Sequence, residues 1–338
     1  MEDKVERAIE AYDVSVRRRY RARGGWLLET NKGPRLLREY ETIQKHFYME
    51  NEMKKHLMKR GFSAVDVVVA ARDGEPVLTL ETGEKYVMYQ WFSGEECDLK
   101  VEQDLAKAGE NLGRLHRVFE EFDMENLVEE PREGDGREEV STEDLLSLYL
   151  RHNRELRRVN RYMKSKKRKT EFEIQAINCF SGYYEKACEA AERLERNGYY
   201  QGLRAGVPML CHGDYNYHNI IMAGKQVATV GFEKAGLGVP LLDLTYFMRK
   251  TLEKNEWKNE VGEVVLNGYR AAKTLDQEQL EFVGIMLLYP EKYWKLLNQY
   301  FNKKKSWLSA KSLEKLQNVG NQEVKREKFL RVFLGKYC

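Results

Sequence analysis

The clearest chemical signal in the chain lies in the stretch Leu210-Cys211-His212-Gly213-Asp214-Tyr215-Asn216-Tyr217-His218-Asn219-Ile220-Ile221. A polar loop lies there between two short apolar runs of the kind found in strands. Phosphoryl transfer needs a carboxylate that orients an attacking hydroxyl, and an oxygen ligand for Mg²⁺ a few residues on. Asp214 and Asn219 have those chemistries at that spacing. The alternative that stays open is a polar loop in which Asp214 only caps backbone N–H groups.

The pattern H-G-D-x-x-x-x-N in this loop resembles the catalytic loop of aminoglycoside phosphotransferases and choline kinases. The resemblance implies a two-lobed protein-kinase-like fold of the α+β class that uses ATP and Mg²⁺. It implies Asp214 as the catalytic base, Asn219 as a metal and nucleotide ligand, and His212 in a structural role. The later stretch from Gly236 to Leu244 also fits, and it includes Asp243, which in that family braces the catalytic loop.

The metal-binding carboxylate of such kinases is missing from the segment Val230-Gly231-Phe232-Glu233. The family carries Asp-Phe-Asp or Asp-Phe-Glu here, and the first Asp binds the metal that bridges the nucleotide phosphates. Glycine occupies that position, so an aspartate at 231 is expected to restore a ligand. In a strand, Glu233 faces the same side as Gly231. Two interpretations therefore stay open for Glu233: a substitute metal ligand, or a polar residue at a strand end.

The phosphate-facing part of the first hundred residues departs from the family pattern as well. Arg38 occupies the position of a phosphate-binding lysine, and it keeps the charge but differs in shape and hydration. Its ion-pair partner is expected to be a helix glutamate, either Glu50 or Glu52, although both could instead be solvated. The loop between the first two strands offers only two glycines, at 24 and 25, where a phosphate clamp needs more bare backbone.

The pattern of apolar residues predicts a small β-rich lobe over residues 1–95 and a larger, mainly helical lobe over 96–338. The small lobe is expected to hold five antiparallel strands and one helix at about 42–60 that stops at Gly61. Two hairpins are predicted in it, around Asn31-Lys32-Gly33 and around Arg72-Asp73-Gly74. Beyond it, helices are predicted at 101–119, after a capping box at 141–144, at 171–197, and over most of 261–338, with a loop at 124–140.

Composition and charge indicate which partners and which environment are to be expected for the chain. The chain has 57 Lys and Arg against 54 Asp and Glu, a net charge of +3 that does not predict a nucleic-acid partner. Apolar runs of about 18 residues are absent from the sequence, so we expect no membrane span. The five cysteines are scattered and the first residues lack an apolar signal region, which favours a reduced, intracellular chain.

Within the superfamily, several further stretches resemble the CotS-type spore coat proteins of endospore-forming bacteria. This resemblance implies a role in the spore coat, other coat proteins as partners, and a location in the mother-cell cytoplasm and then in the coat. It also implies that the metal-binding aspartate is often replaced. The stretches are Tyr89-Gln90-Trp91-Phe92-Ser93-Gly94-Glu95-Glu96-Cys97-Asp98, Leu112-Gly113-Arg114-Leu115-His116, Phe247-Met248-Arg249-Lys250, Leu288-Tyr289-Pro290-Glu291-Lys292-Tyr293-Trp294, Asn298-Gln299-Tyr300-Phe301-Asn302 and Lys305-Ser306-Trp307.

Two functions follow from these patterns. The first is a kinase-fold spore coat protein with a degenerate phosphotransferase site, a pseudokinase that serves a structural or interaction role. The alternative is an active ATP- and Mg²⁺-dependent phosphotransferase that acts on a small-molecule or protein hydroxyl. Gly231 favours the first, and the presence of Asp214, Asn219 and Asp243 favours the second.

Overall fold

The computed structural model describes residues 2–41, 43, 46–122, 144–206, 209–302 and 310–337. The chain forms two compact units, each assembled from separate stretches of sequence. The first contains residues 1–135, 209–236 and 267–273, and the second contains 136–208, 237–266 and 274–338. The boundary between lobes near residue 95 stays a prediction.

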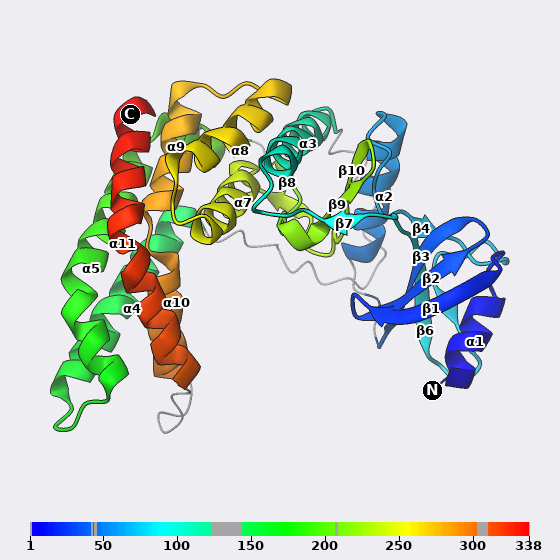
Figure 1. Cartoon of the computed structure of the whole chain (residues 1–338), viewed down its shortest axis with the longest axis horizontal. Coiled ribbons are helices and arrows are strands. Elements are labelled where there is room, and N and C mark those ends of the chain that lie inside the picture. Colours follow the sequence, from blue (N-terminus) through cyan, green and yellow to red (C-terminus); the bar gives the residue numbers. More distant parts are fainter. Residues whose placement is uncertain are drawn as a thin grey trace. The chain divides into compact units, whose positions relative to one another are not determined.

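An antiparallel sheet forms the centre of the first unit (Figure 1). Its path is β1-β2-β3-β6-β4, with β5 also paired to β6, so the described sheet has one strand more than the five predicted. The strands are β1 (Val16–Ala22), β2 (Gly25–Thr30), β3 (Gly33–Tyr40), β4 (Val68–Val69), β5 (Leu78–Thr79) and β6 (Lys85–Gln90). The hairpin predicted at Asn31–Gly33 is confirmed, since Thr30 pairs with Gly33.

The second predicted hairpin is wrong in its pairing. A turn is present, because the Ala71 amide donates to the Glu75 carbonyl and the Gly74 amide donates to the Ala71 carbonyl. The strands on either side nevertheless each pair with β6: Val68 lies opposite Tyr89, and Leu78 lies opposite Tyr86. Both segments are short, and pairing with the longer β6 satisfies more of their backbone groups than pairing with each other.

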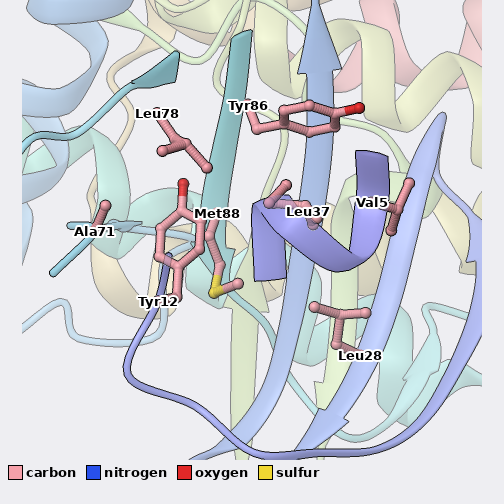
Figure 2. Close-up of a cluster of buried hydrophobic side chains, with 9 residues drawn as sticks. Val5, Tyr12, Leu28, Leu37, Ala71, Leu78, Tyr86 and Met88 are labelled. Carbon is pink, nitrogen blue, oxygen red and sulfur yellow. The ribbon is translucent and has the colours of Figure 1, made fainter. Parts of the chain in front are cut away.

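One face of the sheet is covered by helix α1 (Glu2–Glu10), which the prediction of a single helix in this lobe did not include. Figure 2 shows Val5 and Tyr12 packed with Leu28, Leu37 and Met88 of the sheet. Tyr12 is fully buried just after α1, and β1 begins at Val16.

The other face packs against a second cluster that includes Leu36, Val87 and Tyr89. Because neighbouring strand residues point to opposite faces, Leu36 and Leu37 belong to different clusters. The second cluster also contains Phe47 from helix α2 (His46–Lys59) and Val230, which follows the polar loop. This apolar contact fixes the loop against the sheet.

The polar loop lies between two short strands and includes a 3₁₀ turn. Strand β8 (Met209–Cys211) precedes it, the 3₁₀ turn Tyr217–Asn219 ends it, and β9 (Ile220–Ala223) leaves it. Strand β9 pairs antiparallel with β10 (Gln226–Thr229) and with β7 (Glu95–Glu96). Helix α3 (Glu102–Glu120) buries Leu105, Ala108, Leu112 and Leu115, as its helical spacing predicted.

The second unit is helical apart from the short β11 (Gly236–Gly238), which begins at the last residue of the first unit. Helices α4, α5, α10 and α11 pack together (Figure 1), and none of the described helices is long and apolar enough to cross a membrane. Thr170 caps α5 in a capping box, and Asp144 caps α4. The predicted residues 141–143 and the loop at 124–140 lie outside the described residues. The helices are α4 (Leu145–Ser165), α5 (Glu171–Arg196), α6 (Gly198–Ala205), α7 (Leu241–Lys254), α8 (Asn259–Ala272), α9 (Gln277–Leu288), α10 (Glu291–Asn302) and α11 (Ala310–Tyr337).

Candidate functional site

The polar loop is anchored from within by His212, which is fully buried. The Asp214 amide donates to Nδ1 of this ring at 3.2 Å, and Nε2 lies 3.2 Å from the Val230 carbonyl. Because Nδ1 accepts, the ring proton lies on Nε2 and is donated to Val230. His212 thus ties Val230, the residue before Gly231, to Asp214 of the motif.

Asp214 and Asn219 are brought together at the end of the loop. The Asn219 amide nitrogen donates to the Asp214 carbonyl at 3.0 Å, and Asn216 donates to the Asp214 carboxylate at 3.0 Å. The Asp214 side chain is 26% exposed, so its carboxylate still reaches solvent. The loop therefore presents the predicted base, and Nδ2 of Asn219 holds its backbone without occupying Oδ1, the atom that would bind a metal.

Gly231 has a conformation and surroundings that only glycine accepts easily. Its φ is +76°, in the left-handed region that L side chains rarely adopt. A Cβ built there would lie 2.7 Å from Oδ1 and 2.9 Å from Cγ of Asn219. A side chain at 231 would therefore require the Asn219 amide to shift, and the expectation that an aspartate there restores a ligand stays a prediction. The expectation that Glu233 shares a strand face with Gly231 also fails, since β10 ends at Thr229.

A buried charge cluster lies behind Gly231. The Asp66 carboxylate accepts from the Gly231 amide at 3.0 Å and lies 2.9 Å from Nζ of Lys54. Lys54 is fully buried and also pairs with Glu50 at 2.5 Å, one turn earlier on α2. Burial acts to lower the pKa of Lys54, but Asp66 and Glu50 outweigh it and raise that pKa. The sequence analysis did not identify Lys54 or Asp66. The one signal in the sequence was the spacing of Glu50 and Lys54, which are four residues apart on one helix face.

The prediction that Arg38 pairs with Glu50 or Glu52 is wrong. Glu50 is taken by Lys54, and Glu52 lies on the surface in a pair with Lys55. Arg38 instead donates from its Nη1 to the Glu233 carboxylate, and from its Nε to the Arg23 carbonyl at 3.1 Å. Burial acts to raise the pKa of Glu233, but the Arg38 guanidinium outweighs it, and the pKa of this carboxyl is held below its ordinary value.

The turn between β1 and β2 replaces a glycine-rich loop. Ala22 pairs with Gly25, so only Arg23 and Gly24 lie in the turn, and both have positive φ. This is the two-residue hairpin geometry that favours glycine. The Arg23 guanidinium donates to the carbonyl of His218 and to the carboxylate of Glu96. The turn is thereby fastened to the end of the polar loop.

Lys234 is a site residue that the sequence analysis missed. Its Nζ lies 3.0 Å from Oδ2 of Asp214, and its side chain is 67% exposed. It comes three residues after Gly231, and its charge was the only signal available from the sequence. The base predicted for phosphoryl transfer is therefore paired with a cation of the same chain.

Asp243 belongs to the second compact unit. It is buried in the first turn of α7, and its amide donates to the Pro240 carbonyl at 2.9 Å. Because α7 belongs to the second compact unit, the bracing of the polar loop by Asp243 stays a prediction.

The side chains present do not fit a Mg²⁺ ion as they are arranged. Position 231 offers no carboxylate, Glu233 is paired with Arg38, and Asn219 offers only a neutral amide oxygen, since its Nδ2 donates to Asp214. Within the part of the chain that the structure describes, no three His, Cys, Asp or Glu side chains converge as a metal-binding set. Mg²⁺ needs oxygen ligands, normally including carboxylates.

Comparisons with known proteins agree with this architecture. The chain resembles a crystal structure of an aminoglycoside phosphotransferase from Alicyclobacillus acidocaldarius, with a TM-score of 0.82 and 18% identity over 97% of this chain and 95% of that one. It also resembles a microcompartment-associated aminopropanol kinase (TM-score 0.62, 16% identity, 99% of each chain) and an amicoumacin kinase in complex with AMP-PNP, Ca²⁺ and its antibiotic (TM-score 0.60, 16% identity, 97% and 93%).

These likenesses confirm the predicted kinase-like fold, an antiparallel sheet lobe with a larger helical lobe. The model of the phosphotransferase enzyme family matches residues 18–283, which is most of the chain. The chain therefore belongs to the phosphotransferase enzyme family.

Proposed function

We propose that this chain is a kinase-fold spore coat protein whose phosphotransferase site is degenerate and which acts as a structural or interaction module. The observation that carries the degenerate site is the position of the Asn219 amide, 2.7 Å from where a Cβ at 231 would lie. Without a carboxylate at 231, the ion that bridges nucleotide phosphates loses its main protein ligand.

The pairing of the remaining charges supports the same proposal. Arg38, the residue in the position of the phosphate-binding lysine, is held by Glu233, and Asp214 is held by Lys234. ATP binding would have to break the first pair, and hydroxyl activation would have to break the second. In the family's working sites, the charge at the position of Arg38 faces phosphate and the charge at the position of Asp214 faces substrate.

Calorimetric titration with ATP, with and without Mg²⁺, tests the degenerate site. We expect weak or metal-independent binding, with the amicoumacin kinase, whose structure contains AMP-PNP and Ca²⁺, as a positive control. A ligand at about 100 times its Kd stabilises a protein by about 2.7 kcal/mol, so a thermal-shift titration gives a second readout. Tight, strictly Mg²⁺-dependent ATP binding would overturn the proposal. Loss of that binding in Glu233→Gln would then identify Glu233 as the substitute ligand.

The spore coat role rests on the sequence resemblance to CotS-type proteins, and its partners would be other coat proteins. A fluorescent fusion in sporulating cells tests it directly. We expect signal first in the mother-cell cytoplasm and then around the developing spore. Uniform cytoplasmic fluorescence throughout sporulation would contradict a coat role, whatever the outcome of the ATP titration.

A second candidate is an ATP- and Mg²⁺-dependent phosphotransferase acting on a small-molecule or protein hydroxyl. It is favoured by the partial exposure of the Asp214 carboxylate at the end of a fully formed loop. Lys234 is mostly exposed and could be displaced at small cost. This candidate requires Mg²⁺-dependent ATP turnover that Asp214→Asn lowers by orders of magnitude.

A further inference from the structure

A cavity of about 320 Å³ lies in the first unit, apart from the candidate site. Its walls come from the segment 61–64 after α2, from one face of α3, and from the turn between β9 and β10. Asp214, Asn219, Gly231 and Glu233 do not line it. A ligand site there does not depend on the function proposed above.

Three cations line this cavity against a single carboxylate. Lys107 and Arg114 come from α3, Lys225 comes from the β9–β10 turn, and the carboxylate is Glu110. Among the described residues, no carboxylate lies within ion-pair distance of any of the three cations. Arg114 has its guanidinium 5.9 Å from the centre of the Phe62 ring, which leaves its N–H groups uncommitted by that contact.

A cavity in the second unit provides a comparison, because most of its cations are paired with carboxylates. It has about 340 Å³ and is lined by Arg249, Lys292 and Arg326 among other residues. Four of the five cations that line it have a carboxylate partner: Glu291 for Arg249 and Lys295, Glu253 for Lys292, and Glu323 for Arg326. In the first cavity, by contrast, none of the three cations has such a partner among the described residues.

The chemistry of the three cations selects the ligand. Like charges around one concave surface raise the local positive potential and attract anions. An arginine fork can bind two oxygens of one anionic group, while lysines add point charges from other directions. The volume exceeds that of a bare oxyanion and is within the range of small-molecule sites. We propose that this cavity binds a phosphomonoester, held by Arg114, Lys107 and Lys225.

The site has a structural connection to the candidate site. The Ala64 carbonyl, in the cavity wall, accepts from the Thr229 amide at 2.9 Å. Two residues further on, the Asp66 carboxylate holds the Gly231 amide. A ligand that braces the segment 61–64 would therefore brace the start of the segment that carries Asp66.

Binding is tested with inorganic phosphate and phosphoserine as probes, by calorimetry and thermal shift, with chloride added to match ionic strength. The test variant is the triple change Lys107→Gln, Arg114→Gln and Lys225→Gln. These side chains lie at the surface, so the variant is expected to fold. The matched control removes the same charge from the exposed turn between α4 and α5, through Lys167→Gln, Arg168→Gln and Lys169→Gln.

We expect saturable binding of phosphoserine to the wild type and to the control triple, and binding at least about tenfold weaker in the cavity triple. Equal loss in both triples would show a general charge effect and would overturn the proposal. Lack of saturable binding to the wild type at tens of millimolar probe would overturn it as well.

The phosphomonoester could be a phosphorylated side chain of a partner protein or a small free molecule. Comparing free phosphoserine with a short phosphoserine peptide and its unphosphorylated form distinguishes the two. A phosphopeptide that binds at least about tenfold more tightly than phosphoserine supports the site and assigns it to a partner protein's side chain. Equal affinities support the site and assign it to a small free phosphomonoester. Equal binding of the unphosphorylated peptide would overturn the role of the phosphate.

Discussion

The two sides of the candidate site match the residue pattern of the family to different degrees. The loop side, with His212, Asp214 and Asn219, retains the pattern of the family, and the side chains of His212 and Asn219 are hydrogen-bonded to backbone groups of Asp214 and Val230. The phosphate side departs from the pattern at Arg38 and Gly231, and its two charges, Arg38 and Glu233, pair with one another. On the loop side the polar side chains therefore hold the backbone in place, whereas on the phosphate side they neutralise each other.

The buried cluster behind the loop gives the largest test of this comparison. Lys54→Met leaves Glu50 and Asp66 buried without their cation, and such changes cost about 3–5 kcal/mol. Urea unfolding at neutral pH measures the loss. The control is Lys55→Met, where an exposed pair with Glu52 is removed and a change within about 0.5 kcal/mol is expected. A loss below about 1 kcal/mol for Lys54→Met would contradict the structural role.

Gly231→Ala tests whether the missing carboxylate is excluded by the backbone and by Asn219. A Cβ in the left-handed region costs about 1–2 kcal/mol, and overpacking against Asn219 adds about 1–3 kcal/mol. We expect a loss of about 2–5 kcal/mol in thermal or urea unfolding. Gly61→Ala is the matched control, because its φ is +80° and nothing lies within 4 Å of its Cβ. Equal losses in the two variants would show that Asn219 leaves room for a side chain.

The pH dependence of stability tests the phosphate side. The pKa of Glu233 is lower in the folded chain than its ordinary value of 4.5. Its ionised form therefore stabilises the fold above pH 4.5, and this contribution is lost as the pH falls below that value. The Glu233 side chain is 41% exposed, so solvent screening limits the effect to about 1 kcal/mol at most.

Unfolding free energies of the wild type and Glu233→Gln should differ at neutral pH and converge in acid. The control is Glu52→Gln, which removes only an exposed pair with Lys55 and should cost little at any pH. A difference for Glu233→Gln that grows toward acid would contradict the pairing with Arg38.

The smallest expected effect concerns Asp214. If the site is degenerate, Asp214→Asn and the wild type should show the same background ATP turnover, measured as released phosphate. Lys234→Ala sharpens the test, because it frees the Asp214 carboxylate without changing the loop. Mg²⁺-dependent turnover that appears in Lys234→Ala and is lost again with Asp214→Asn would show that Lys234 restrains a working base.

Much of the fold was predictable because it depends on local signals. The apolar residues of β3 and β6 and the helical spacing of α3 predicted those elements, and Gly61 marked the end of α2. The pairing of β4 and β5 with β6 was not predictable, because two-residue strands carry too little pattern to choose a partner. Helix α1 was not among the predicted elements of the first lobe, and its packing against the sheet required the tertiary structure.

By itself, the sequence determined the loop from His212 to Asn219 and the glycine at 231, since chemistry that needs fixed residue types at fixed spacing is visible in one dimension. Only the tertiary structure decided the partners of the charges: Arg38 with Glu233, Lys54 with Asp66, and Asp214 with Lys234. Except for residues one helical turn apart, a charge's partner depends on chain segments brought together by packing, and no spacing rule encodes it.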